Sequence, residues 1–369
     1  MLKKLEPHLW PGLELMDLLI ILIIAMAVLI LFFLLYILIS HFSNWRRNNF
    51  YNKKREEWEE VLYSYISGEI TTSRAVGLLT GNYLVLWNFL KPYLTDLKGE
   101  EREKIIILAR ASGLTSYFFK KLKKGKKKEM ITAASALGKL EERKVITHLK
   151  RMLFSNDTVE MTFAAKAIAD LGETSYLILV FRKLLNDTYT TYEGISEIAV
   201  RFGQGICLPI KNLVQEWLDG ERDLAETFQV PEEQVLSLMV DILGYYRYFD
   251  AAPQLENALQ QTDNNEVIIH IFKALAQLEY PVSIALTPFL SHPDWIIRSQ
   301  AVKYIGKMQD RTYNEEVKEL LKEDNWWVRY YAAQALYLIG EAPYLQQLSS
   351  LEDNRAEMSQ YILYQYRAS

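Results

Sequence analysis

Residues able to take part in acid–base, nucleophilic or metal chemistry occur in this 369-residue chain, but their spacing favours none of these reactions. A zinc site needs closely spaced Cys and His ligands, and a cysteine nucleophile needs a histidine partner. Cys207 is the only cysteine, which excludes a disulfide framework and fits a reducing compartment. The histidines are scattered and lack metal-ligand spacing: His8, His41, His148, His270 and His292.

The glycines and carboxylates also follow structural rather than catalytic patterns. The segment RFGQGICLP, residues 201–209, lacks a preceding strand and a following Lys-Ser or Lys-Thr, so it is no nucleotide loop. The pairs Glu232-Glu233 and Glu315-Glu316 fall at expected helix starts, where negative charge interacts favourably with the helix dipole. Neither G-x-S-x-G nor H-E-x-x-H occurs. We therefore expect a protein that is not an enzyme, without a catalytic site, metal or cofactor.

The residues best suited to chemistry of another kind, recognition, lie in DNWWVRYYAAQALYLIG, residues 324–340. Trp, Tyr and Arg dominate the binding energy of protein interfaces. The same stretch carries an Ala and Leu pattern typical of a helix. Whether the aromatic side chains bind a partner or fill a core depends on the elements that position them.

An uncharged stretch near the N-terminus is the first such element. Residues 18–39, LLIILIIAMAVLILFFLLYILI, would form about 33 Å of helix, enough to cross the hydrocarbon core of a membrane. A cleaved signal peptide is the alternative, but its apolar region is typically about 7 to 15 residues and ends in a small-x-small site. The following LISHFSNW has no such site. We expect a transmembrane helix at 17–40 after a short external tail at 1–16.

The basic residues around this stretch predict its orientation. Cytoplasmic flanks of membrane helices carry an excess of Lys and Arg. Two lysines precede the stretch, and five basic residues follow it: Arg46, Arg47, Lys53, Lys54 and Arg55. The sequence therefore predicts a single-pass protein of the cell membrane, of bacterial type, with its N-terminus outside and its large C-terminal part in the cytoplasm.

Charge is distributed unevenly beyond the apolar stretch. Residues 41–130 contain 18 Lys and Arg against 10 Asp and Glu, whereas residues 131–369 contain 22 against 33. The densest basic segment is FFKKLKKGKKKEM, residues 118–130. Near an anionic membrane each basic residue contributes roughly 1 kcal/mol, so this segment predicts contact with lipid headgroups or an acidic partner. A solvated turn between two helices is the alternative. The candidate residues are Lys120, Lys121, Lys123, Lys124, Lys126, Lys127 and Lys128.

The pattern from residue 41 onward is helical throughout. Residues 41–129 predict a basic juxtamembrane helix followed by a helical adaptor, broken near Gly68, Gly81 and Gly99. Sustained alternation of the strand kind is lacking, which predicts an all-α protein.

Beyond residue 129 one pattern recurs seven times. Taking Arg329 as a reference residue, small or apolar residues lie three, four, seven and eight positions further on, beginning with Ala332 and Ala333. The equivalent reference residues are Met130, Met161, Ile195, Leu236, Ile268 and Arg298. Each copy follows a second helical segment and a polar turn such as SNDT or SHPD, whose residues favour helix starts. One helical hairpin cannot bury its own apolar stripe, so successive hairpins must stack into a solenoid.

The stretches PDWIIRSQAVKYIG, residues 293–306, and DNWWVRYYAAQALYLIG resemble HEAT repeats. The resemblance covers roughly residues 130–369 and is strongest over 264–340. It implies an all-α, right-handed α-solenoid of HEAT-like hairpins, preceded here by a single transmembrane helix. The solenoid is expected at 130–369, with a C-terminal capping helix.

In the HEAT family a turn Asp and a following Arg form a ladder of polar contacts between repeats. Asp294 and Arg298 match this pattern. Asn325 occupies the position of the Asp before Arg329. Ile268 occupies the position of the Arg in the copy that precedes Arg298, so we expect an interrupted ladder.

Some proteins of this superfamily resemble DNA glycosylases, and others resemble lyases that act on bilin attachment. A glycosylase needs a strongly basic groove for phosphates, whereas the distal repeats here are acidic. The bilin lyases are soluble, and no motif of this chain argues for them. We expect no nucleic-acid partner.

In a HEAT solenoid the second helix of each hairpin usually lines the concave face. Residues two, five and nine positions after each reference point away from the core. They are Phe163, Lys166, Asp170, Leu238, Asp241, Tyr245, His270, Lys273, Gln277, Gln300, Lys303, Lys307, Tyr331, Gln334 and Leu338. Their mixed chemistry favours a protein partner over nucleic acid. A groove that merely faces water is the alternative.

Two residues of the aromatic stretch, Trp327 and Tyr330, have no counterpart in other copies, whereas Trp326 takes the place of Trp295 and predicts a packing role. The candidate partner-binding residues are Trp327, Tyr330, Tyr331, Gln334, His270, Lys273 and Lys303. The insertion at 219–234 is another candidate surface, or a plain connection.

The leading hypothesis is a membrane-anchored cytoplasmic HEAT-repeat scaffold that binds a protein partner at the inner membrane face. The alternative is an accessory or regulatory subunit of a membrane enzyme complex, such as a membrane glycosyltransferase.

Overall fold

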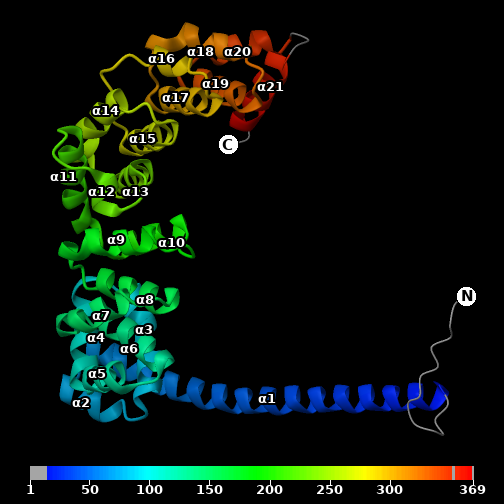
Figure 1. The fold of residues 1–369 in the computed structure, drawn as a ribbon, viewed down its shortest axis with the longest axis vertical. Coiled ribbons are helices and arrows are strands. Elements are labelled where there is room, and N and C mark those ends of the chain that lie inside the picture. Colours follow the sequence, from blue (N-terminus) through cyan, green and yellow to red (C-terminus); the bar gives the residue numbers. More distant parts are fainter. Residues whose placement is uncertain (1–14, 351–353, 368–369) are drawn as a thin grey trace, which may run out of the picture. The chain divides into compact units, whose positions relative to one another are not determined.

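A computed structural model describes residues 15–350 and 354–367, and every regular element in this part of the chain is a helix (Figure 1). The expected all-α class is therefore confirmed. The chain divides into two compact units, Met1–Tyr117 and Phe118–Ser369. The expected external tail, residues 1–14 in particular, lies outside the described residues.

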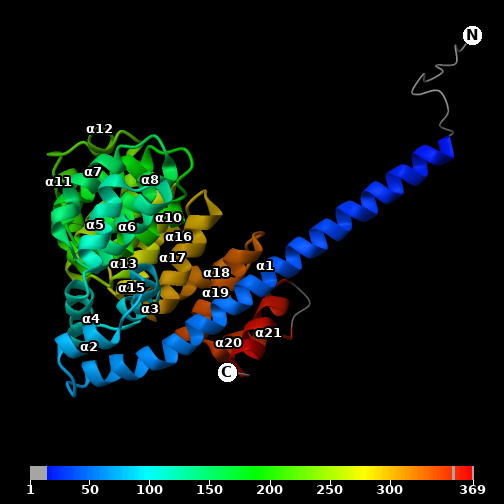
Figure 2. The ribbon, with the colours of Figure 1, turned by 90° about the horizontal axis from the view of Figure 1, so that it is seen from below.

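Helix α1 (Leu15–Ile66) belongs to the first unit and runs without a break from the apolar stretch to Ile66, as Figures 1 and 2 both show. Its segment Leu19–Ile39 has 21 residues, a mean hydropathy of 3.3 and no part buried inside the protein. By length and composition this segment can cross a membrane. A signal sequence near the N-terminus would meet the same criteria.

The C-terminal end of α1 is held in a small helical bundle with α2 (Thr72–Leu78), α3 (Tyr83–Asp96) and α4 (Gly99–Ala111). Trp58 is buried and packs edge-on against Phe89, with 5.4 Å between the ring centroids. The Lys104 ammonium donates to the carbonyl of Ile66, the last residue of α1, at 2.9 Å. Such a contact satisfies a carbonyl that a helix end leaves without a partner.

The second unit, whose boundary falls within α5 (Leu114–Lys124), is a series of helical hairpins. The first helices of the hairpins are α5, α7 (Ile146–Leu153), α9 (Leu177–Leu185), α11 (Cys207–Leu218), α14 (Ala252–Gln261), α16 (Thr287–Leu290), α18 (Asn314–Leu320) and α20 (Ala342–Leu348). The second helices are α6 (Lys127–Lys139), α8 (Thr158–Asp170), α10 (Tyr192–Arg201), α13 (Glu232–Tyr245), α15 (Asn265–Leu278), α17 (Trp295–Met308), α19 (Trp326–Leu338) and α21 (Asn354–Arg367). The seven reference residues fall in α6 to α19, so the repeat pattern is confirmed.

Each second helix contacts the second helix of the next hairpin, and glycine lets three of these pairs approach closely. A Cβ added at Gly138 would lie 2.9 Å from Ala167 Cα, and one added at Gly306 would lie 2.7 Å from Ala335 Cα. Gly244 meets Ala274 in the same way, at 3.0 Å. In all three cases the glycine stands eight positions after its reference residue and the alanine six after the next. This glycine–alanine seam joins consecutive repeats.

The polar turns start the second helices as the sequence predicts. The Asp294 carboxylate accepts from the Ile296 N–H at 2.8 Å, and Asn325 accepts from the Trp327 N–H at 2.9 Å. Asn325 thus caps its helix as an Asp would, because the side-chain oxygen alone satisfies the free N–H groups.

Polar contacts between repeats run through the same turns. The Asn265 amide donates to Asp294 at 3.0 Å, and Arg298 pairs with Glu323 at 2.8 Å. Arg329 is buried and donates to the carbonyl of Glu323 at 2.6 Å. At the equivalent position two repeats before Arg329, Ile268 is buried and supplies no guanidinium.

The insertion at 219–234 packs onto the unit. It contains the short helix α12 (Leu224–Phe228), whose two terminal residues are fully buried. The Asn186 amide donates to the carbonyl of Phe228 at 2.8 Å. The insertion is thereby fixed against α9 and α13.

A buried carboxylate fixes the connection between α15 and α16. Glu256 accepts hydrogen bonds from the N–H and hydroxyl of Ser283, from the Ile284 N–H at 3.1 Å and from the Tyr280 hydroxyl at 3.1 Å. Burial alone would raise the pKa of Glu256, but these donors outweigh it and lower the pKa below its usual value.

We predict that Gly306→Ala lowers the free energy of unfolding by about 1–3 kcal/mol, because its methyl group would overlap the backbone of Ala335. Chemical denaturation of the full chain in detergent measures this change. Gly194→Ala is the control: it adds the same methyl group to α10 with 3.5 Å of clearance, so improved helix propensity should leave stability equal or higher. Equal effects of the two substitutions would contradict the close approach at Gly306.

We predict that Glu256→Gln costs about 1–3 kcal/mol at neutral pH, because an amide cannot accept all of these hydrogen bonds. The folded-state pKa of Glu256 is lowered, so its contribution is present above the unfolded pKa of about 4.3 and is lost as pH falls through the folded value. Urea titrations between pH 7 and pH 3 should therefore show the gap between wild type and variant shrinking on acidification. A gap independent of pH would rule out this role of the charge.

Candidate partner-binding site

Five aromatic rings gather at the start of α19 and on the neighbouring α21. This aromatic cluster consists of Trp326, Trp327, Tyr330, Tyr331 and Tyr361. Trp326 stacks on Tyr330 with 5.3 Å between centroids and meets Trp327 edge-on at 4.8 Å. Tyr330 lies 6.0 Å from Tyr361, which joins the two helices. The rings therefore form one continuous surface.

Much of this aromatic cluster is open to solvent although the helix beneath it is buried. Trp327 is 49% exposed and Tyr361 is 53% exposed, whereas Val328 and Ala332 are fully buried. The helical period explains the difference, since residues three and four apart share the inner face. An exposed aromatic surface on a rigid helix is the type of patch that marks interaction sites.

Polar groups border the aromatic cluster. The Lys303 ammonium of α17 lies over the Tyr331 ring at 5.2 Å, within the range of a cation–π contact. The Gln334 amide donates to the Tyr366 hydroxyl at 3.1 Å. Burial, with the neighbouring Tyr330, raises the pKa of Tyr331, so its hydroxyl stays neutral at physiological pH.

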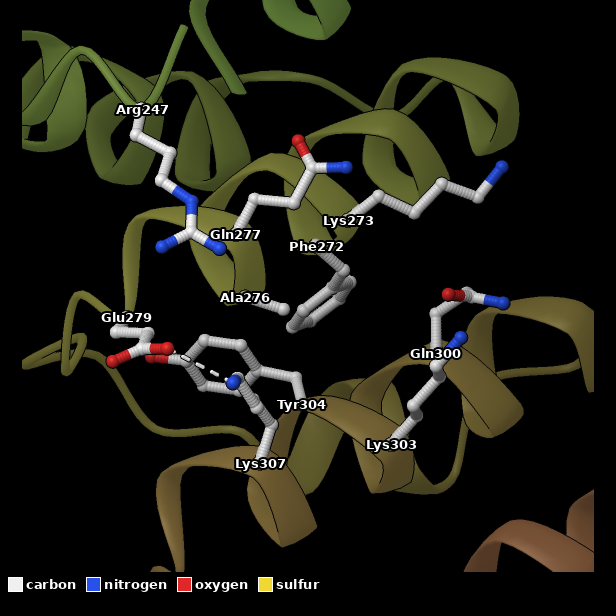
Figure 3. A pocket seen from close by; sticks show the side chains of 10 residues that line it. All are labelled: Arg247, Phe272, Lys273, Ala276, Gln277, Glu279, Gln300, Lys303, Tyr304 and Lys307. Atoms are coloured by element: carbon white, nitrogen blue, oxygen red, sulfur yellow. Dashed lines mark hydrogen bonds and ion pairs between the residues drawn. The ribbon is translucent and has the colours of Figure 1, made fainter. Parts of the chain in front are cut away.

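Next to Lys303 lies an open cavity of about 280 Å³ between α15 and α17, shown in Figure 3. The rings of Phe272 and Tyr304 form its floor. Four cationic side chains line it, with a single carboxylate, Glu279. The full lining is Arg247, Phe272, Lys273, Ala276, Gln277, Glu279, Gln300, Lys303, Tyr304 and Lys307. We call it the basic pocket.

His270 lies in a separate polar contact. Its Nδ1 donates to Asp241 at 2.6 Å, and the Tyr192 hydroxyl donates to the other oxygen of the same carboxylate at 2.8 Å. These residues come from three successive second helices, so the contact joins repeats. Burial, followed by the charge of Asp241, raises the pKa of Tyr192 and keeps it protonated.

Of the predicted partner-binding residues, the structure thus brings together Trp327, Tyr330, Tyr331, Gln334 and Lys303. Lys273 joins them through the basic pocket, because Lys303 belongs to both surfaces. His270 remains apart.

The predicted lysine cluster spans the end of α5 and the start of α6. Six of its seven lysines are exposed, and Lys121 is half-buried and pairs with Glu129 at 2.5 Å. Lys127 pairs with Asp157. Hydrogen bonds from Lys121 and from the Lys126 N–H lower the pKa of Glu129. Part of the cluster therefore stabilises the turn, and the rest faces solvent.

Sequence reasoning missed three residues and misplaced one. Trp326 was expected to pack at the turn, but it is 39% exposed and belongs to the aromatic cluster. Tyr361 and Arg247 reach the site from positions outside the repeat pattern. The repeated tyrosines of the last helix could have indicated that Tyr361 takes part in the site. Leu238 was expected in the groove and is fully buried, because α13 is covered by α10, α11, α12 and α15.

The fold and site define an α-solenoid with an exposed aromatic surface near its C-terminal end. Residues 284–360 match the family model described as HEAT repeats. The resemblance is thus confirmed for this segment of the solenoid, which contains HEAT repeats. The matched segment includes the aromatic cluster except Tyr361.

Among solved structures, the chain is similar to the complex of CpcE and CpcF of phycocyanin lyase from Nostoc sp. PCC7120. The identity is 16% over 68% of this chain and 87% of that one, with a TM-score of 0.24. An engineered protein is similar at 19% identity over 79% of this chain and 80% of that one, with a TM-score of 0.25. No curated protein matches by sequence. Likenesses this distant transfer no activity or ligand to this chain.

Proposed function

We propose that this protein is a membrane-anchored scaffold whose cytoplasmic HEAT solenoid holds a protein partner at the inner membrane face. The observation that carries the proposal is the exposure of Trp326, Trp327 and Tyr361 over a fully buried helix face. Exposing such rings to water is unfavourable at roughly 25 cal/mol per Å², so a partner that covers them gains that free energy. Rigid Trp and Tyr residues also lose little conformational entropy on binding.

The anchor in this proposal is the segment Leu19–Ile39, and its orientation follows from the basic residues after it. Because α1 is continuous to Ile66, the bundle around Trp58 would lie about 28 Å beyond Ile39 along α1, on the cytoplasmic side. The exposed lysines at the end of α5 extend the proposal: they would contact anionic headgroups or an acidic partner.

We predict that Trp327→Ala reduces partner recovery strongly, by about thirtyfold in affinity if Trp327 is a hot-spot residue. The measurement is quantitative co-purification of the tagged full chain from native membranes in mild detergent. Thermal unfolding of the variant should stay near that of wild type, because Trp327 is half exposed.

Trp295→Ala is the matched control, since Trp295 begins α17 as Trp326 begins α19 and is similarly exposed at 37%. The amount of partner recovered with Trp295→Ala should equal the amount recovered with wild type. A stoichiometric membrane enzyme among the recovered proteins would assign the chain to a membrane enzyme complex as an accessory subunit. Unchanged recovery with Trp327→Ala, or no specific partner at all, would contradict the proposal.

We further predict that protease added outside intact cells leaves the solenoid uncut, and that it is cut once the cells are opened. Immunoblotting against a C-terminal tag follows the cleavage. Loss of the tag from intact cells would place the solenoid outside and overturn the proposed orientation.

A further inference from the structure

The basic pocket has an excess of positive charge, although acidic residues outnumber basic ones in the surrounding part of the chain. Arg247, Lys273, Lys303 and Lys307 line it together with one carboxylate, Glu279. Residues 131–369 as a whole carry 22 basic against 33 acidic residues, so acidic side chains are not scarce in this part of the chain. Clustered like charges repel one another and are tolerated more easily when an anion occupies the site.

The two halves of the basic pocket differ. In Figure 3 the head groups of Arg247 and Lys307 lie with Glu279 on one side of the two rings, while Lys273, Lys303 and Gln300 lie on the other side. Lys307 pairs with Glu279 at 2.9 Å, and this contact together with Arg247 lowers the pKa of Glu279. Lys273 and Lys303 form no ion pair within the part of the chain that the structure describes. The positive charges in the half of the pocket that contains Lys273 and Lys303 are therefore not compensated by a carboxylate.

The repeat register shows which group is missing. In α8, Lys166 stands five positions after its reference residue and pairs at 2.9 Å with Glu197, two positions after the next reference residue. Asp241 and His270 occupy the same two positions in later repeats and are 2.6 Å apart. In these two pairs a charged group at position five of one repeat meets a complementary group at position two of the next repeat.

Lys273 and Lys303 both stand at position five. The residues at position two of the following repeats are Gln300 and Tyr331, neither of which carries a negative charge. Two successive repeats thus have a lysine at the position of Lys166 but no carboxylate at the position of Glu197. Lys303 uses the face of the Tyr331 ring instead, at 5.2 Å.

We propose that the basic pocket binds a carboxylate side chain of the partner, which completes the contact missing at Lys273 and Lys303. The occupant is an acidic peptide segment whose neighbouring apolar or aromatic residue rests on the aromatic cluster. Lys303 links the two surfaces, since it lines the basic pocket and lies over Tyr331. Gln300 and Gln277 supply amide donors for the same oxygens. This inference rests on the proposed function and names the chemistry of the partner.

The test uses the full chain in detergent and a fluorescein-labelled peptide of alternating Glu and Phe, followed by fluorescence anisotropy. The matched Gln and Phe peptide should bind about tenfold more weakly, and rising salt should weaken the Glu peptide selectively. Lys273→Glu should reduce binding of the Glu peptide about tenfold. Lys144→Glu, the control, reverses an exposed charge elsewhere in the same unit and should change nothing.

Gln300→Glu is the sharper variant, because it supplies within the chain the carboxylate that Glu197 supplies to Lys166. It should weaken binding of the Glu peptide and raise the melting temperature, which separates competition for Lys273 from damage to the fold. Equal binding of both peptides, or no effect of Lys273→Glu and Gln300→Glu, would overturn the inference. Displacement of the peptide by inorganic phosphate at equimolar concentration would overturn it as well, in favour of a phosphate site.

These outcomes are separable from those for the proposed function. If Trp327→Ala abolishes partner recovery while Lys273→Glu leaves it unchanged, the scaffold role stands and the acidic segment does not. If neither substitution affects partner recovery, both fail.

Discussion

The structure depends on one constraint: a single hairpin of two amphipathic helices cannot bury its apolar face, so each repeat is stable only against its neighbours. The glycine–alanine seam is where this dependence is most demanding, because Gly306 leaves space for the backbone of the next helix and for little else. Cross-repeat polar pairs then fix which side chains lie opposite each other. Surfaces such as the aromatic cluster exist because the stack holds their helices rigidly.

Much of this architecture could be read from the sequence because its causes are local. Helix starts follow from turn residues such as Asp294, and the repeat follows from small residues at fixed spacing. The site was harder to predict. Tyr361 joins the aromatic cluster only because the last helix packs on α19, which no repeat position encodes. Arg247 reaches the basic pocket from a turn outside the repeated positions.

The comparison of Trp295 with Trp326 shows why position in a repeat is an incomplete guide to role. Both residues begin a second helix and are about equally exposed. Only Trp326 has aromatic neighbours one and four residues later and another on the following helix, so that its ring belongs to a larger aromatic surface. A role in binding therefore belongs to the neighbourhood and not to the residue type.

The continuity of α1 has a mechanical consequence. A straight α-helix transmits rotation as well as distance, and each residue advances it by about 1.5 Å and turns it by about 100°. The apolar segment Leu19–Ile39 and the bundle around Trp58 are thus joined by one continuous helix, so rotation of one end about the helix axis rotates the other. The number of residues between them determines which side of the bundle faces a given neighbour of the apolar segment.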